Sequence, residues 1–263
     1  MIVFASFVPH SPLLIPEVGK NNLAQLQNTV DAYQKLEQDI YAAKPDVIFL
    51  IARHADILPA SFSINQRPEI NIDFKKFGDL VTKIKIDNDI ALGYQIKEAV
   101  ETSMPITLTS QELLDYSAGV PLYYLTRHLP KIKVVPISYS SLDNQKHFDF
   151  GKHLKEMANR SGKRVAIIAA GDLSHKLHQD SPAGYSPRAQ EFDQQLMKDL
   201  NENKIDDLLN LERSFVEEVS AIDGFYSLLI LLGAIKNLNY RSDRLSYQAP
   251  FGIGYLVQNF KLR

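Results

Sequence analysis

Two side chains that can transfer protons follow one apolar segment. The run from Val165 to Ala170 (VAIIAA) leads through Gly171 to Asp172 and His175. An uninterrupted apolar run predicts a strand buried on both faces, and ligands of open α/β sheets bind beyond the carboxyl ends of strands. His175 is therefore a candidate general acid/base. An acid at a strand exit typically caps backbone amides; alternatively, Asp172 supports the imidazole, which it would flank if residues 173–176 begin a helical turn.

Two more histidines follow predicted strands. His10 comes after IVFASFVP, and His54 comes after VIFLIAR. Taken singly, each is more typical of an ordinary hydrogen-bonded loop residue. Because the carboxyl ends of parallel strands meet at one edge, we expect both to approach His175, which favours a metal or proton-transfer site.

A metal held by two neutral imidazoles usually binds a carboxylate as well. The chain has no cysteine, which excludes thiolate ligands, disulfides and a cysteine nucleophile. The carboxylates near the predicted start of an apolar helix are Glu217, Glu218 and Asp223. Asp223 suits a helix N-cap equally well, and the two glutamates suit a solvated face.

The pattern of apolar residues indicates the elements that position these side chains. Buried strands are predicted at 2–7, 46–52, 133–138, 164–170 and 254–260, with helices at 22–43, 88–102, 119–128, 148–159, 187–201 and 224–235. Residues 60–86 break the alternation and predict an antiparallel excursion. We therefore expect one α/β domain over residues 1–263, with a central, mainly parallel sheet and helices on both faces.

Composition limits the classes of partner. The formal net charge of −2 over 263 residues gives no electrostatic reason to expect nucleic acid or an anionic membrane as partner. No apolar run has the length of a membrane span, and the first residues, MIVFASFVPHSP, predict a strand rather than a signal peptide. We expect a cytoplasmic protein.

Several segments together resemble a known family. They are PHSPLLIPEVG, GDLSHKL, AGYSPRAQEFD, SLLILLGAI and SYQAPFGIGYLV. The chain resembles, over nearly its whole length, the LigB-type class III extradiol ring-cleavage dioxygenases, in a bacterial branch near the Memo-like proteins.

The resemblance implies roles for individual residues. It assigns His10 and His54 to a metal, His175 to acid/base chemistry beside the substrate, and Asp172 to the support of His175. The third metal ligand in ring-cleaving members is a late glutamate, and Memo-like relatives have a cysteine before a glycine there. This sequence has Asp223 before Gly224, so Asp223 is the implied third ligand.

Two departures from the family pattern affect the pocket. The family's Leu-Asp-His-Gly stretch reads LDYSAG here, so Tyr116 replaces a histidine, and the usual Glu-Cys pair reads Ile222-Asp223. A tyrosine still donates a hydrogen bond but does not take up a proton near pH 7. Arg53, beside His54, is a candidate partner for a substrate carboxylate, although an exposed arginine is more often only solvated.

The functional hypothesis is a non-haem Fe(II) dioxygenase that cleaves a catechol-type diol with O₂. The alternatives are a Memo-like metal-binding protein without this activity, holding zinc, copper or iron, and a zinc-dependent hydrolase. Each of these three classes is compatible with a homo-oligomer or with a small partner subunit.

Overall fold

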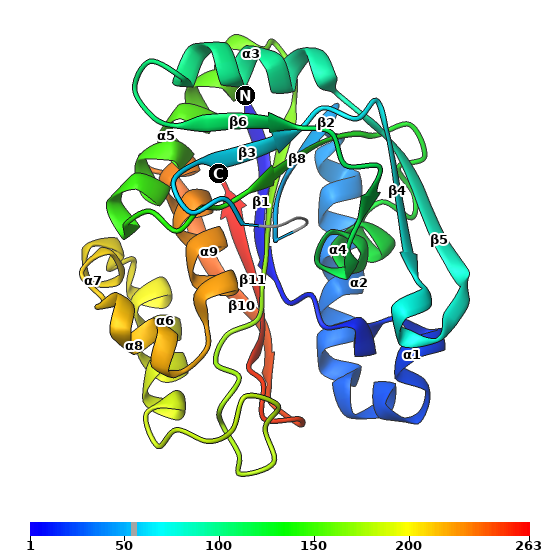
Figure 1. Ribbon diagram of the computed structural model, residues 1–263, viewed down its shortest axis with the longest axis vertical. Helices are drawn as coiled ribbons and strands as arrows, with labels where there is room; N and C mark the ends of the chain where they lie inside the picture. The colour runs from blue at the N-terminus through cyan, green and yellow to red at the C-terminus, as the bar shows by residue number, and fades with distance from the viewer. Residues whose placement is uncertain (54–56) are drawn as a thin grey trace.

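The computed structural model describes residues 1–53 and 57–263, which form an 11-stranded sheet with helices on both faces (Figure 1). The strand order is β10-β11-β1-β9-β2-β8-β5-β4-β7, and β3 and β6 continue from β8. The strands are β1 (Ile2–Val8), β2 (Val47–Ile51), β3 (Phe62–Asn65), β4 (Glu69–Phe74), β5 (Asp79–Asn88), β6 (Ile106–Thr109), β7 (Leu113–Leu114), β8 (Lys133–Ser138), β9 (Val165–Ala170), β10 (Tyr240–Gln248) and β11 (Tyr255–Leu262).

The two faces of the sheet pack against different helices. Successive strand residues alternate between the faces, so Phe4 and Val8 of β1 join one core while Ala5 and Phe7 join the other. The first core contains α2 (Gln27–Ala43) and α4 (Tyr116–Leu125). The second contains α3 (Ile90–Val100), α5 (Asn144–Arg160), α6 (Ala189–Glu202) and α9 (Ile222–Ala234). The shorter helices are α1 (Pro16–Gly19), α7 (Ile205–Leu209) and α8 (Arg213–Glu218).

The sheet is mixed, so the expectation of a mainly parallel sheet is wrong. The central strands β1, β9, β2 and β8 are parallel, but β11 runs antiparallel to β1, and both β10–β11 and β4–β5 are antiparallel pairs. Strands that follow each other through a short connection must reverse direction. The predicted alternation of strands and helices therefore holds only for the centre of the sheet.

Most predicted elements lie close to the observed ones. The five predicted strands correspond to β1, β2, β8, β9 and β11, and the excursion at 60–86 contains β3, β4 and β5. The helix predicted at 22–43 begins as a 3-10 helix (Lys20–Leu26) before α2, and α4 begins three residues before its predicted start at 119. Strand β10 was not predicted, because its sequence is polar and its residues are only half-buried or exposed.

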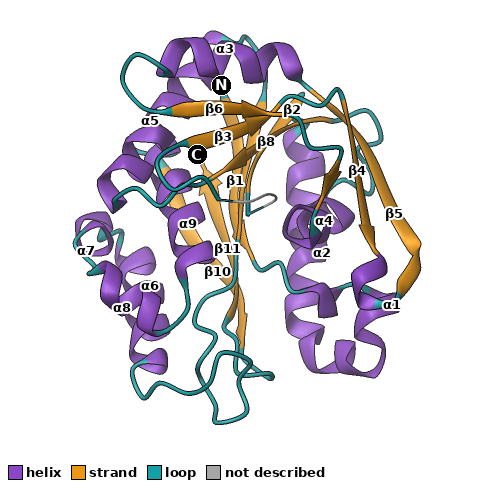
Figure 2. Cartoon of the chain, in the orientation of Figure 1, coloured by secondary structure: helices purple, strands orange, loops and turns teal. Residues whose placement is uncertain are grey.

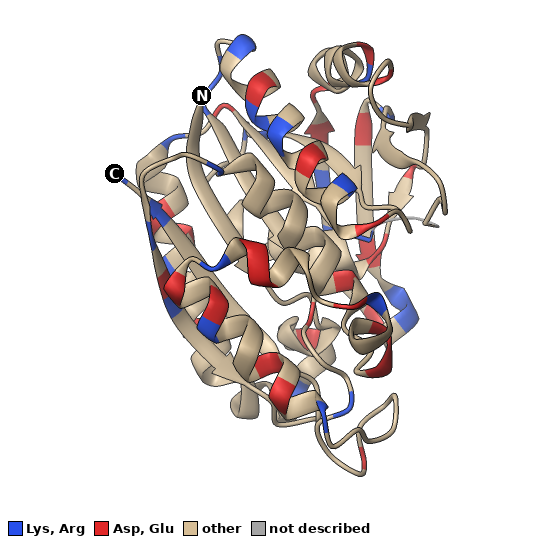
Figure 3. Ribbon diagram, turned by 90° about the vertical axis from the view of Figure 1, so that its left-hand side faces the viewer, with Lys and Arg blue, Asp and Glu red and all other residues tan. Residues whose placement is uncertain are grey.

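The carboxyl ends of the central strands open toward long irregular segments. Figure 2 shows loops beyond these ends, including the connection from β9 to α6. Acidic and basic residues are interspersed over the view in Figure 3. Across residues 1–53 and 57–263, no helix has the length and apolarity of a membrane span.

Candidate active site

Three neighbouring parallel strands end at the same edge of the sheet. Strands β1, β9 and β2 lie side by side, and they lead to His10, Asp172 and Arg53 respectively. The predicted metal ligand His54 lies outside the described residues. At this edge His10 contacts Asp172, and the predicted convergence of His10, His54 and His175 stays a prediction.

His10 is a buried imidazole held beside a carboxylate. The side chain is almost fully buried, and the His10 backbone N–H donates to Asp172 Oδ1 at 3.0 Å. His10 Nε2 lies 3.8 Å from Asp172 Oδ2, whereas His10 Nδ1 is buried without a hydrogen-bond partner among the described residues. The preceding Pro9 carbonyl accepts a hydrogen bond from the Tyr33 hydroxyl, which fixes the loop. A buried, unpartnered ring nitrogen is a suitable donor for a metal ion.

Asp172, which follows β9, contacts His10, which follows the neighbouring strand β1. Residues 171–174 are irregular rather than helical, so the turn that would place Asp172 beside His175 does not form. As expected of an acid at a strand exit, Asp172 accepts from a backbone amide, although the donor is 162 positions away in the chain. Its charge also contributes, after burial, to the raised pKa values of Tyr33 and Tyr255.

His175 is half-buried in the loop after β9. Its backbone N–H donates to the Val219 carbonyl at 3.0 Å, and its Nδ1 lies 2.9 Å from the Leu173 carbonyl. A ring nitrogen that faces a carbonyl oxygen must carry the proton. In the neutral imidazole, Nε2 then keeps its lone pair and is the nitrogen that can act as a base.

Asp223 lies in the first turn of α9 and is held by two side chains. The Tyr139 hydroxyl donates to Asp223 Oδ1, and Arg53 Nη1 lies 3.6 Å from Asp223 Oδ2. The nearby carboxylate is the main cause of the raised pKa of Arg53, and burial followed by that same charge raises the pKa of Tyr139. The N-cap of α9 is Ala221, so the alternative role of Asp223 as an N-cap is wrong.

Tyr116 lies between His10 and the exposed end of the β4–β5 hairpin. Its ring meets the His10 imidazole edge-on at a centroid distance of 5.6 Å and the Phe77 ring at 5.2 Å. It is the first residue of α4, where the Asp115 side chain caps the Ser117 backbone N–H. Burial is the largest cause of the raised pKa of Tyr116, so its phenol remains a hydrogen-bond donor at neutral pH.

Two glycines let the end of β9 touch the start of α9. A Cβ on Gly171 would lie 2.3 Å from Gly224 Cα, and a Cβ on Gly224 would lie 2.2 Å from the Asp172 carbonyl oxygen. No larger residue fits without a backbone shift. This contact brings the Asp172 and Asp223 segments to the same edge.

Two residues of the site were not predicted. Tyr139 directly follows the predicted strand at 133–138, so the strand-end criterion that selected His10 would also have found it. Asp193 lies within the quoted segment AGYSPRAQEFD, and it contacts the His175 loop through the Ser174 backbone N–H. The glutamates behave as predicted for a solvated face, since Glu217 pairs with Arg213 and Glu218 with Arg188.

The described donors fit a metal in part. No three His, Asp or Glu side chains are grouped to hold a metal ion within residues 1–53 and 57–263, a set that lacks His54. His10 Nδ1 is nevertheless an unpartnered buried donor. Asp223 keeps acceptor capacity, because a carboxylate offers about four lone-pair positions and its two partners use only some of them.

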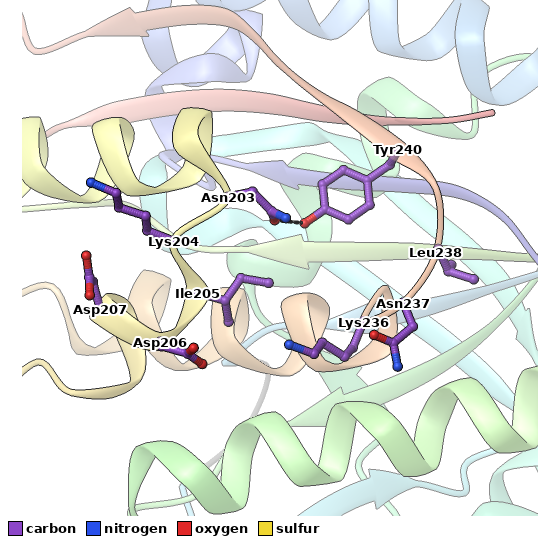
Figure 4. A pocket seen from close by; sticks show the side chains of 9 residues that line it. All are labelled: Asn203, Lys204, Ile205, Asp206, Asp207, Lys236, Asn237, Leu238 and Tyr240. Atoms are coloured by element: carbon purple, nitrogen blue, oxygen red, sulfur yellow. Dashed lines mark hydrogen bonds between the residues drawn. The ribbon is translucent and has the colours of Figure 1, made fainter.

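A polar pocket of about 470 Å³ lies elsewhere on the molecule (Figure 4). It lies between the ends of α6 and α9 and the start of β10, where Tyr240 donates to Asn203 Oδ1 at 2.6 Å. Because Tyr240 pairs with Leu262 and β11 is antiparallel to β1, this pocket is near the amino end of β1. It is therefore at the sheet edge opposite His10.

The fold and this strand-end site define an α/β protein with candidate proton-transfer and metal-binding side chains at one sheet edge. Residues 4–258 match the family described as the catalytic LigB subunit of aromatic ring-opening dioxygenase, and the chain belongs to that family.

The similar proteins agree with this membership. A Clostridium acetobutylicum protein is 26% identical over 97% of this chain and 56% of its own length. A MEMO1 family protein of Methanococcus maripaludis is 28% identical over 67% of this chain and 57% of its own length. The chain thus spans little more than half the length of these relatives. The crystal structure of an uncharacterized Escherichia coli K12 protein shares the fold, with a TM-score of 0.70, 18% identity and coverage of 98% and 99% of the two chains.

Proposed function

We propose that this chain is a non-haem, Fe(II)-dependent extradiol dioxygenase that opens the ring of a catechol-type diol with O₂. The observation that carries the proposal is His10, whose buried Nδ1 has no partner among the described residues while Asp172 holds its backbone and lies beside Nε2. A satisfied structural histidine would have both ring nitrogens paired. Family membership supports the same class of reaction.

In this proposal His10, His54 and Asp223 hold the metal. Two imidazoles and one carboxylate suit Fe(II) and leave positions open for ligands, and the same set accepts Zn(II). The Asp172 carboxylate beside His10 is the kind of partner that orients a ligating imidazole. The bound metal would supply a lowered pKa for the coordinated diol and a meeting point for both reactants.

The other residues bind the substrate and move its proton. His175 Nε2 removes a proton from a substrate hydroxyl, because Nδ1 already carries the ring's own proton toward the Leu173 carbonyl. Tyr116 lines the His10 side of the site and donates a hydrogen bond. Arg53, with a half-exposed guanidinium, pairs with a substrate carboxylate.

A second candidate is a Memo-like metal-binding protein without dioxygenase activity, which the MEMO1 family relatives favour. The engagement of Asp223 by Tyr139 and Arg53 also fits a site tuned away from oxygen chemistry. In this class the metal would be zinc, copper or iron, and a zinc-dependent hydrolase is a separate alternative.

Anaerobic reconstitution tests the two candidates. Protein purified without a histidine tag is loaded with Fe(II) or Zn(II), the metal content is measured, and O₂ uptake is recorded with catechols that carry or lack a carboxylate. The expected result is one iron per chain and turnover of at least one diol. We expect His175→Gln to keep the iron and lose at least about a hundredfold in kcat, and His10→Ala to lose the iron.

Full iron loading without O₂ uptake across the diol panel would reject the dioxygenase proposal. Tight stoichiometric zinc binding with no oxygen chemistry would support the Memo-like candidate. Unchanged iron binding in both His10→Ala and His54→Ala would reject the proposed metal site itself.

A further inference from the structure

The peptide bond between Leu173 and Ser174 has a partner at each end. Its N–H, on Ser174, donates to Asp193 Oδ1 at 3.0 Å. Its carbonyl, on Leu173, lies 2.9 Å from His175 Nδ1. The peptide is trans, so its N–H and C=O point in opposite directions from one rigid plane. Whatever fixes the N–H therefore also aims the carbonyl.

The Asp193 side chain, which accepts from the Ser174 N–H, is itself held in place. It lies on α6 with its side chain fully buried, and its second oxygen, Oδ2, accepts from the Tyr247 hydroxyl of β10 at 2.6 Å. The fit is tight, since a Cβ on Gly254 would lie 2.2 Å from Asp193 Oδ2. The carboxylate is thus held between a helix, a strand and the loop.

The carbonyl that Asp193 aims decides the state of His175. With Nδ1–H bonded to the Leu173 carbonyl, the proton is kept on Nδ1 and the lone pair stays on Nε2. A neutral imidazole without this acceptor distributes its proton between the two nitrogens. The orientation of one peptide plane therefore selects the tautomer whose basic nitrogen is Nε2.

We propose that Asp193 is the positioning residue for His175: through the Leu173–Ser174 peptide it holds the imidazole in the Nδ1–H tautomer. The catalytic consequence, but not the structural one, rests on the proposed function. The Leu173 N–H donates to the Gly254 carbonyl and the Gly254 N–H donates to the Ser174 carbonyl, so these two bonds hold the adjoining peptides. The N–H of the Leu173–Ser174 peptide itself is held by Asp193.

The ionisation of Asp193 is compatible with this role. Burial raises its pKa to about 6, against the lowering effects of the Tyr247 hydroxyl, the Ser174 N–H and the His175 imidazole. At pH 7.5 the group is an acceptor at both oxygens. Near pH 6 it takes up a proton, so its hydrogen bond with Ser174 changes in the same range.

Nuclear magnetic resonance of the full chain tests the proposal without relying on turnover. Long-range ¹⁵N–¹H spectra at pH 7.5 report the tautomer of His175, assigned by its loss in His175→Gln. We expect one Nδ1–H tautomer in the wild-type chain and a mixture in Asp193→Ala. Asp199→Asn is the matched control, since Asp199 is also buried on α6 but accepts from Gln195; it should leave the tautomer unchanged.

A second measurement covers the case in which Asp193→Ala does not fold. The Ser174 amide proton should titrate near pH 6 in the wild-type chain and not in Asp193→Asn, which keeps the shape and removes the ionisation. An unchanged His175 tautomer in folded Asp193→Ala, or identical Ser174 titrations in wild type and Asp193→Asn, overturns the proposal.

Activity separates this inference from the proposed function. In iron-loaded enzyme that turns over, Asp193→Ala should lower kcat at least about tenfold and change KM less than threefold. The reason is that this substitution alters the base, His175, but not the substrate-binding residues Tyr116 and Arg53. If the wild-type chain has no turnover but the tautomer shifts as expected, the positioning role stands and the dioxygenase proposal fails.

Discussion

Asp193 and His147 are buried ionisable side chains whose pKa values shift in opposite directions. Burial raises the pKa of Asp193 to about 6 and lowers that of His147 to about 4. In both cases the neutral form is favoured, because a charge in the interior loses its hydration. His147 is neutral at pH 7 and stacks on Tyr226, whereas Asp193 is mostly ionised there. Of the two, Asp193 therefore carries a buried charge at neutral pH.

The buried charge of Asp193 should cost stability. Its folded pKa lies above the ordinary value of 3.8, so the folded state binds the proton more tightly and stability falls as pH rises through about 6. A pKa difference of about two corresponds to at most about 3 kcal/mol. We expect Asp193→Asn to raise the free energy of unfolding by about 1–3 kcal/mol at pH 7.5.

The pH dependence of that gain is the check. Urea unfolding at several pH values should show the gain of Asp193→Asn shrinking below pH 6 and vanishing below pH 3.8, where both the folded and the unfolded states bind the proton. An equal gain at pH 4 and pH 7.5 would show that the ionised carboxylate carries no such cost.

Arg53 should distinguish substrates by charge. Its guanidinium is half-exposed and faces Asp223, so a ligand carboxylate can approach from the solvent side. Loss of one charge-assisted hydrogen bond predicts about a tenfold rise in KM for carboxylated diols in Arg53→Gln. Initial rates with a carboxylated and an uncharged catechol measure this. Arg53→Lys keeps the charge and serves as control; equal effects of Arg53→Gln on both substrates would refute the assignment.

At the scale of elements, the contact between the end of β9 and the start of α9 positions Asp172 and Asp223. Gly171 and Gly224 meet backbone to backbone, and Asp172 and Asp223 directly follow and precede them in sequence. Any widening of this contact moves both carboxylates. The stability of the contact and the geometry of the site are therefore linked.

Gly224→Ala should be strongly destabilising. Its Cβ would meet the Asp172 carbonyl oxygen at 2.2 Å, and backbone on both sides has to move. We expect a loss of roughly 3 kcal/mol or more in thermal or chemical unfolding. Gly184→Ala is the control: nothing lies within 4 Å of its Cβ, and its φ of +86° costs only about 1 kcal/mol. Similar losses in both variants would contradict the tight contact.

The elements that the sequence predicts are those with a continuous apolar pattern. Strands β1, β2, β8 and β9 are buried and were predicted, whereas β10 has polar residues and was missed. The pattern of a strand does not state its direction, and so the antiparallel flanks went unrecognised. The sheet edge at which His10 and Asp172 lie could be predicted from the ends of the apolar strands. The contact between Asp172 and His10 could not be predicted, because it joins residues 162 positions apart in the sequence.

At the scale of the whole molecule, metal binding should add to stability. A ligand that binds only the folded state at a hundred times its Kd contributes about 2.7 kcal/mol. For a chain of this size that is a rise in Tm of about 5–10 °C. Calorimetry with Fe(II) under nitrogen, or with Zn(II), should show the rise, and a chelator should reverse it. An undiminished rise in His10→Ala would place the metal elsewhere.

Strand β11 pairs with β1, and the preceding strand β10 carries Tyr247, whose hydroxyl donates to Asp193. A ribosome releases β1 long before it releases either of these two strands. The loop that carries Ser174 and His175 therefore cannot reach its final form until the segment with Tyr247 has been synthesised.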